Sequence, residues 1–305
     1  MELLMEIIRS AIPSTIPVLL VALGGSYSYH ANVFNIAMEG MLLVSAFFAV
    51  AISYATGSWL LGLIFAIIGS VAISLLFSLF TIYLKTGEFI TGIAINMFVA
   101  GGTTYFLRQI FNVKGALIST KIQALPRLEI PFIGKIPFLG PILDSHNILV
   151  YIGILIVVPL VYIHLYKTRF GLRLRATGFD YKVVDSVGIK SDPIKLKAVI
   201  LGGILCGLGG ASLSLGYMKL FTENMSAGRG WIALAIIILT KGHPIGIFVL
   251  SFMFGLFEGV GLSLQGFGVP NEFTQMLPYI STIVVLYIYS VKDRGKKQRL
   301  SNNAA

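Results

Sequence analysis

Charged residues are scarce in this sequence. Asp, Glu, Lys and Arg make up 12% of its 305 residues, whereas an ordinary soluble domain carries about 25%. Hydrophobic residues make up 56%, and the mean hydropathy is +0.87. So little charge cannot cover the surface of a soluble protein of this length. The composition therefore excludes water as the solvent for most of the chain.

Cysteine is almost absent, and the few histidines are scattered. The single cysteine, Cys206, lies in an apolar run, which excludes a disulfide framework and a cysteine-based metal site. The four histidines share no spacing of three or four residues that would place two of them on one helix face. They are His30, His146, His164 and His243. We expect neither a metal nor a cofactor.

The sequence also lacks a nucleotide-binding motif of the form G-x-x-x-x-G-K-[ST]. Gly134 and Lys135 are followed by Ile136, and Gly295 and Lys296 lie in a polar tail. We therefore expect a chain that is not an enzyme. If it moves a solute uphill, the energy must come from an ion gradient or from a partner ATPase.

Long apolar runs are what the sequence has in abundance. Residues 40–84 contain no charged residue, and about 20 apolar helical residues cross a hydrocarbon core of roughly 30 Å. Glu2 and Glu6 stand where a signal peptide would be positive, so the first span is expected to be permanent. We expect an all-α, polytopic transmembrane bundle of about eight to nine spans with broken or half helices, forming a single domain over 1–305. The expected spans are 3–23, 36–55, 59–84, 88–107, 148–166, 196–217, a short 231–240, 244–264 and 274–291.

The positions of Lys and Arg predict the sidedness. Eight of the 23 basic residues lie in 167–197 and five in the tail 292–305, which places both segments in the cytoplasm. The segment 109–147 then becomes an external loop. Nine crossings with a cytoplasmic C-terminus put the N-terminus outside, unless 24–38 is re-entrant and changes the count. The net charge of +10 is thus a topology signal, and no nucleic-acid partner is expected.

Polar residues inside the spans are candidates for the translocation pathway, because ionisable groups at membrane depth are costly. Asn35 and Glu39 are four residues apart and are expected to share a helix face after a break at Gly24 and Gly25. Glu39 could instead bind a backbone amide freed by that break. Further candidates are Asn96, Glu258 and Trp231; Trp231 could stack on a ligand or anchor a helix at the interface.

A break at 241–244 (KGHP) divides what would otherwise be one long span. The ten-residue piece before the break would cover about 15 Å, half of a bilayer. Two interpretations remain open: a tight cytoplasmic turn, or a half helix that lines a pathway.

Glycines cluster in two of the later spans. The pairs Gly203/Gly207 and Gly255/Gly259 have the small-xxx-small spacing that lets two helix backbones approach closely. We expect these four residues to pack helices within the bundle.

The segment 176–190 reads as a short helix with its own start and stop signals. Asp180 is expected to cap the helix, Val183, Val184 and Val187 to lie on one side, and Gly188 to end it. Such an amphipathic helix between two spans could lie on the lipid surface or could be gripped by a soluble partner.

Four motifs in the same order resemble the permease subunits of sugar and nucleoside ABC importers, which belong to the branched-chain amino acid type. The motifs are NVFNIAMEG at 32–40, IPFIGKIPFLGPIL at 130–143, LRATGFDYKVVDSVGI at 174–189 and GRGWIALAIIILTKGHPIG at 228–246. Together they extend over nearly the whole chain. The closest resemblance is to the nucleoside and simple-sugar permeases.

The resemblance implies a multi-pass permease of the bacterial plasma membrane that pairs with a second, homologous permease as a heterodimer. It also implies a cytoplasmic ATPase with two cassettes and an extracytoplasmic substrate-binding lipoprotein. The segment 167–197 would be the cytoplasmic coupling segment. Its ATPase-coupling residues would be Arg175, Gly178, Asp180, Val183, Val184, Asp185, Val187, Gly188 and Ile189. The chain departs from the family pattern at Phe179, at Val183 and Val184, and over 241–243, which puts individual contacts with the ATPase in question.

The expected function is therefore translocation of a nucleoside or simple sugar, with ATP hydrolysed by the partner subunit. The alternative is a gradient-driven carrier or channel that acts without an ATPase. A membrane scaffold that transports nothing would have no evident use for buried carboxylates. Ribose-type permeases have an additional first helix, and the present chain is expected to begin at their second, in agreement with an N-terminus outside.

Overall fold

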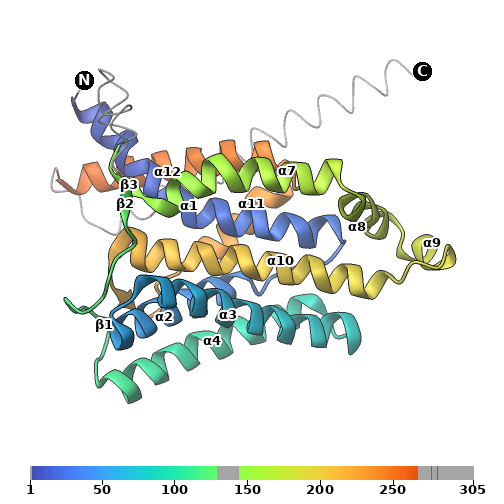
Figure 1. Cartoon of the computed structure of the whole chain (residues 1–305), viewed down its shortest axis with the longest axis horizontal. Coiled ribbons are helices and arrows are strands. Elements are labelled where there is room, and N and C mark those ends of the chain that lie inside the picture. The colour runs from blue at the N-terminus through green and yellow to red at the C-terminus, as the bar shows by residue number, and fades with distance from the viewer. Residues whose placement is uncertain (1, 129–143, 267–275, 277–279, 281–305) are drawn as a thin grey trace.

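The computed structural model describes residues 2–128 and 144–266, together with 276 and 280. It is a bundle of long helices that run roughly along one axis (Figure 1). The helices are α1 (Glu2–His30), α2 (Met38–Thr56), α3 (Trp59–Ser78), α4 (Glu88–Phe111), α6 (Ile148–Tyr151), α7 (Val158–Lys167), α8 (Arg169–Phe179), α9 (Tyr181–Ser186), α10 (Ser191–Ala211), α11 (Arg229–Thr240) and α12 (Pro244–Gly266). Three π-helical segments continue the spans: η1 (Leu79–Tyr83) follows α3, η2 (Ile152–Val157) joins α6 to α7, and η3 (Ser212–Met218) follows α10.

The expected all-α transmembrane bundle is confirmed, but eight to nine spans is slightly too many for the described residues. Seven helices there are long and apolar enough to cross a membrane. The expected short span at 231–240 is α11, whose 12 residues cover only about 18 Å. The expected span 274–291 lies outside the described residues apart from 276 and 280.

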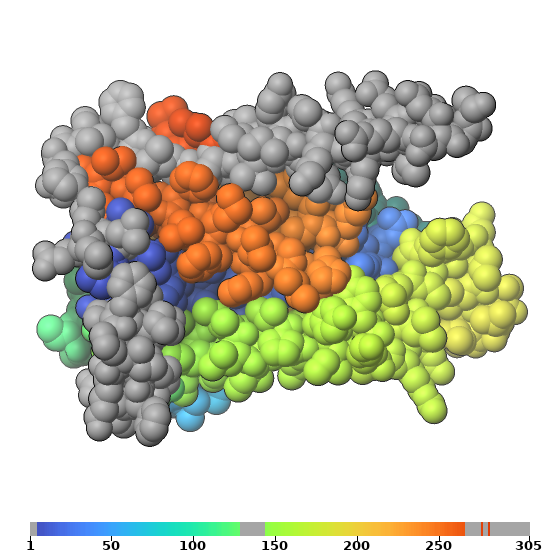
Figure 2. All heavy atoms as spheres, turned by 90° about the horizontal axis from the view of Figure 1, so that it is seen from above, coloured from blue at the N-terminus to red at the C-terminus, as the bar shows by residue number. Residues whose placement is uncertain are grey.

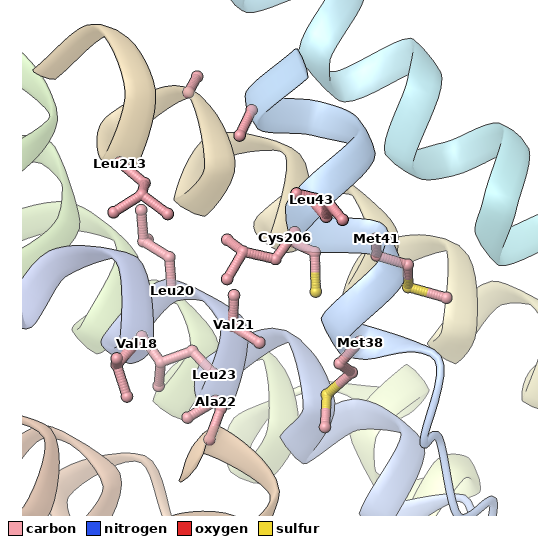
Figure 3. Close-up of a cluster of buried hydrophobic side chains, with 14 of the residues drawn as sticks. Val18, Leu20, Val21, Ala22, Leu23, Met38, Met41, Leu43, Cys206 and Leu213 are labelled. Carbon is pink, nitrogen blue, oxygen red and sulfur yellow. The ribbon is translucent and has the colours of Figure 1, made fainter. Parts of the chain in front are cut away.

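Helix α1 lies at the centre of the bundle. It contacts α10, α11 and α12, and its residues 14–28 are all buried. Side chains from α1, α2 and α10 meet in a dry cluster (Figure 3), which includes Leu20 and Leu23 of α1, Met41 of α2 and Cys206 of α10. The outer helices α3, α4, α7 and α12 keep most of their apolar surface exposed, as expected for helices that face lipid.

The sequence predicted a break at Gly24 and Gly25, but the first helix is continuous there. It continues to His30, and the two glycines allow other helices to approach closely. A Cβ at Gly24 would lie 2.7 Å from the carbonyl oxygen of Gly202 in α10. The chain breaks instead at 31–37, where Asn32 has a φ of 54°.

The break at 241–243 is a tight turn, and the short helix before it is real as well. Lys241 and Gly242 both have positive φ angles, and the Gly242 amide donates to the Ile237 carbonyl at 2.8 Å. Pro244 opens α12, where its missing N–H has no cost. The structure therefore shows a tight turn after a short helix, and the prediction that this helix lines a pathway stays a prediction.

Two short ladders lie at the end of the bundle opposite α8 and α9 (Figure 1). Strand β1 (Ala116–Leu117) pairs with β4 (Phe221–Thr222), and β2 (Arg127–Leu128) pairs with β3 (His146–Asn147), both antiparallel. An ion pair of 3.0 Å between Arg108 of α4 and Glu223 fixes the connection after β4. Most of the expected external loop 109–147 belongs to this end, and 129–143 lies outside the described residues.

The four glycines expected to pack helices lie at two helix contacts. In α10, Gly203 faces Ser74 of α3, and a Cβ at Gly207 would lie 2.7 Å from the Cα of Ile67. In α12, Gly255 faces Thr15 of α1, and a Cβ at Gly259 would lie 2.7 Å from the carbonyl oxygen of Ile7. Larger side chains at these positions would push the helices apart.

Candidate functional site

The start of α11 lies against α2 and is capped by a carboxylate from that helix. Glu39 Oε1 accepts from the Gly228 amide at 2.9 Å, and Oε2 accepts from the Gly230 amide at 2.6 Å. Glu39 is 8% exposed and also lies in the first turn of α2. One negative charge therefore faces the positive ends of two helices. Gly230 is required here because a Cβ would lie 2.6 Å from the Glu39 Cα.

Asn96 of α4 braces the break that precedes α2. Its Oδ1 accepts from the Gly40 amide at 2.8 Å, and its Nδ2 donates to the Ile36 carbonyl at 3.0 Å. Backbone groups at membrane depth need such partners because no water is available there. Asn96 therefore fixes the position at which α2 begins.

A largely buried ion pair connects α11 to α12. Arg229 Nη2 lies 2.6 Å from Glu258 Oε1, and the two side chains are 11% and 14% exposed. Arg229 follows Gly228, which accepts the left-handed φ of 80° that starts α11. The pair neutralises two charges that would each be costly alone at this depth.

Asn35 and Trp231 are the two pathway candidates whose side chains are not held by a partner on both sides: Asn35 keeps an unpartnered oxygen, and Trp231 is partly exposed. Asn35 lies in the connection before α2, so it does not share a helix face with Glu39 as predicted. Its side chain is 3% exposed, and within the described residues its Oδ1 has no hydrogen-bond partner. It borders a small cavity between α1 and α11 that Tyr29 and Ile238 also line. Trp231, in the first turn of α11, is 41% exposed.

The segment between α7 and α10 projects from one end of the bundle as α8 and α9 (Figure 1). Asp180 caps α9, because its Oδ1 accepts from the Lys182 and Val183 amides at 2.9 and 3.4 Å. Gly188 follows the helix with a φ of 83°. The start signal at Asp180 and the stop signal at Gly188 thus both act as the sequence predicts.

Apolar side chains are exposed on and beside α9, among the exposed polar residues Lys182 and Ser186. Phe179 is 94% exposed, and Val183 and Val187 are exposed as well. Val184 is buried, so the prediction that the three valines share one exposed side is wrong for this residue. Successive helical residues differ in direction by about 100°, so Val184 faces inward while Val183 faces outward.

Several contacts hold α8 and α9 against the spans. Arg175 stacks over the ring of Tyr166 at 4.9 Å, and Gly178 lies against the His30 carbonyl at the end of α1. Asp185 accepts from the amide and hydroxyl of Ser191 at 2.8 and 3.0 Å, which caps α10. Ile189 packs on the core from the loop that leads into α10.

Sequence reasoning missed Arg229 and the pair formed by Tyr27 and His164. Arg229 is the single basic residue between two glycines immediately before a short apolar helix, and that context was a signal for a buried ion pair. The Tyr27 Oη lies 3.0 Å from His164 Nδ1 across 137 positions of sequence, and no local pattern predicts it. The described part of the chain holds no cluster of three or more potential metal ligands.

The bundle of seven apolar helices long enough to cross a membrane, the short capped helix α11 and the projecting pair α8 and α9 are the features of a polytopic membrane protein. The chain belongs to the family of permease components of branched-chain amino acid transport systems, whose pattern matches residues 7–286. It is the permease subunit of an ABC transporter and a multi-pass protein of the plasma membrane.

Three relatives show the range of this family. The chain is 31% identical to the nucleoside ABC transporter permease NupC of Lactococcus lactis, covering 92% of this chain and 91% of the relative. It is 32% identical to the guanosine ABC transporter permease NupQ of Bacillus subtilis, over 93% and 92%. It is 28% identical to the putative glucose ABC transporter permease TsgC13 of Haloferax volcanii, over 92% and 90%. No solved structure matches the chain.

Proposed function

We propose that this permease translocates a nucleoside and is driven by a cytoplasmic ATPase that grips α9. The observation that carries the proposal is the way α9 is attached. Val183 and Val187 are exposed on its outer side. Its inner side is fixed by Val184, by the Asp185 cap on Ser191, and by Lys195, whose ammonium lies 4.7 Å from the centre of the Tyr181 ring. A force on the outer side is therefore transmitted to α10.

Two helices receive that force. Helix α10 continues from α9 into the core, where it contacts α1, α2 and α3. Helix α8 abuts the end of α1 at Gly178. A rigid connection to both central helices supports a lever that reorients the bundle. Such a lever works only if the ATPase binds α9 differently in its two nucleotide states.

The pathway is proposed to pass the capped start of α11. Glu39, Asn96 and Glu258 are occupied with backbone amides, a carbonyl or an arginine, so their role would be to hold the half helix in place. The unpartnered Oδ1 of Asn35 and the partly exposed side chain of Trp231 would meet the solute. An amide and an aromatic face suit a neutral solute that carries hydroxyl groups and a flat base.

The nucleoside assignment is supported by the printed names of NupC and NupQ, and TsgC13 keeps a simple sugar as the second candidate. Uptake of labelled guanosine, ribose and glucose by a deletion strain with and without this gene separates the two. Restored guanosine uptake supports the proposal, whereas restoration of sugar uptake alone contradicts it.

The proposed assembly includes a second permease, and a binding lipoprotein at the end that carries the β-ladders. Lactococcus lactis has two matching relatives with the same description, NupC and NupB, which supports a heterodimer. The basic segment 167–197 supports a cytoplasmic position for α8 and α9. Since α1 ends beside α8, its N-terminal end would then lie outside.

Replacement of Val187 by Asp tests the grip of the ATPase. A charge on the exposed apolar side should abolish co-purification of the ATPase and nucleoside-stimulated hydrolysis, and the unfolding of the permease should not change. The matched control is Ile118→Asp, because Ile118 is 72% exposed at the opposite end of the bundle. It is compared by co-purification of the ATPase alone, since the binding lipoprotein is proposed at that end. If V187D retains a coupled ATPase, α9 is not the docking element. If the purified chain alone moves nucleoside on a proton or sodium gradient, it is a secondary carrier.

A further inference from the structure

An apolar groove of about 750 Å³ runs along the bundle between α7 and α10. Helix α1 lies between these two helices (Figure 1), and its Tyr27 forms the floor. The walls come from Leu155, Leu160 and Ile163 on one side and from Leu201 and Leu205 on the other. The volume lies within the range of about 300–1,000 Å³ that is typical of small-molecule sites. The groove faces outward from the spans and is therefore open to the hydrocarbon of the bilayer.

The groove changes character at the end nearest α8. There it is lined by His164 and Thr168. The His164 Nδ1 lies 3.0 Å from the Tyr27 hydroxyl, and the imidazole ring stacks on Phe170 with 5.0 Å between the ring centres. The side chains that close this end are thus held in place.

Basic residues surround the same end. Lys167 and Arg169 flank Thr168 in sequence, Arg173 follows one turn later on α8, and all three side chains are exposed. Among the described residues none of them has an ion-pair partner. They stand where the apolar surface of α7 ends, at the level that lipid headgroups occupy. An apolar slot in the membrane thus ends in an uncompensated positive cluster.

We propose that the groove binds one anionic phospholipid, with an acyl chain along α7 and α10 and the phosphate on Lys167 and Arg169. Basic pockets between transmembrane helices are a recognised mode of binding for anionic headgroups. Charge excludes a second copy of this chain as the occupant, because it would bring its own basic segment against the first. Figure 2 views the bundle from another side, on which α7 lies beside α12. The lipid would thus contact α7 on the side away from α12.

The proposal is tested on the full-length permease, purified in mild detergent and exposed to vesicles of equal parts phosphatidylglycerol and phosphatidylcholine. Native mass spectrometry counts the lipids that remain bound. One phosphatidylglycerol per chain is expected. Lys167→Gln combined with Arg169→Gln should lower the preference for phosphatidylglycerol by a factor on the order of 30, since each basic residue near an anionic surface contributes about fivefold.

Two controls separate groove binding from general charge. Lys182→Gln with Lys190→Gln removes the same charge from exposed positions outside the groove and should leave the bound lipid in place. Ile204→Trp fills the groove from α10 and should displace the lipid without any change in charge. Its matched control is Met97→Trp on the exposed face of α4.

Four results would overturn the proposal. The first is equal retention of the two lipids by the unchanged chain. The second is an equal loss in the Lys182/Lys190 control, which would mean adhesion to any basic surface. The third is full retention after Ile204→Trp together with no loss in the Lys167/Arg169 variant, which would place the lipid elsewhere. Loss of the lipid on assembly with a second permease would also overturn it, because the groove would then be a protein interface.

Discussion

Replacement of Glu39 by Gln should destabilise the permease far more than its small change in shape suggests. The carboxylate accepts two backbone hydrogen bonds at 2.9 and 2.6 Å, from Gly228 and Gly230. A glutamine offers one acceptor oxygen and turns an NH₂ donor toward the other amide. One charge-assisted hydrogen bond is lost, which costs about 1.5–3 kcal/mol. The favourable interaction with two helix N-termini is lost as well, and at a partly buried site it contributes up to about 2 kcal/mol.

The expected total is about 3–4 kcal/mol for Glu39→Gln. Glu88→Gln is the matched control, because the Glu88 carboxylate accepts a single bond from the Phe34 amide at 2.7 Å near an exposed end of the bundle. The carbonyl oxygen of Gln can replace that acceptor, so the control should lose less than about 1 kcal/mol.

The assay is reversible unfolding of the purified chain in mixed micelles with increasing SDS. The tryptophan signal, which includes Trp231 beside the site, reports on unfolding. Hydrogen exchange should localise the effect, with faster exchange at the Gly228 and Gly230 amides than in the unchanged protein. If E39Q unfolds at the same SDS fraction as E88Q, Glu39 does not cap α11 and the reasoning fails.

Further substitutions test three other contacts. Arg229→Met or Glu258→Leu alone should each destabilise the permease by about 3–5 kcal/mol, because each leaves one charge without its partner. The double variant should lose much less than the sum of the two. Additive effects in SDS unfolding would contradict the ion pair. Asp185→Asn should cost about 1 kcal/mol by weakening the cap of α10, and unchanged unfolding would remove that role. Hydrogen bonds from Arg108 hold the pKa of Glu223 below its ordinary value of 4.5. The ion pair between Arg108 and Glu223 is therefore fully formed above pH 4.5, and it is lost as the pH falls through the lowered pKa. Arg108→Gln should raise the pKa toward 4.5, which carboxyl NMR measures; an unchanged titration would refute the cause.

The length of the short helix α11 could be predicted from the sequence, but the partners of its polar residues could not. The charge island at 241–243 and the short apolar stretch before it predicted a piece half a membrane long, and α11 is that piece. Glu39 was recognised as a buried carboxylate with either a pathway role or a backbone partner. Its partners are 189 and 191 residues away, so only the fold decides between them. Arg229 was overlooked for the same reason, since its partner lies on another helix.

The docking helix shows the opposite balance. The signals at Asp180 and Gly188 act over a few residues, and the sequence predicted both correctly. The burial of Val184 is different, because it depends on how α9 leans on α10. Side-chain direction in a six-residue helix follows from its two anchors, and the anchor at Asp185 uses a cap that local pattern did not reveal.

The sequence by itself determined the class of this protein. The long apolar runs and the scarcity of charge require membrane spans, because a soluble fold of this length could not cover so much apolar surface. The order of the four motifs indicates the permease family. The tertiary structure alone decided which polar groups meet inside the membrane. In a medium without water each such group must find an internal partner. Those partners come from distant parts of the chain. The hydrogen bonds of Glu39 with two amides and the ion pair of Arg229 with Glu258 therefore form only once the helices have packed.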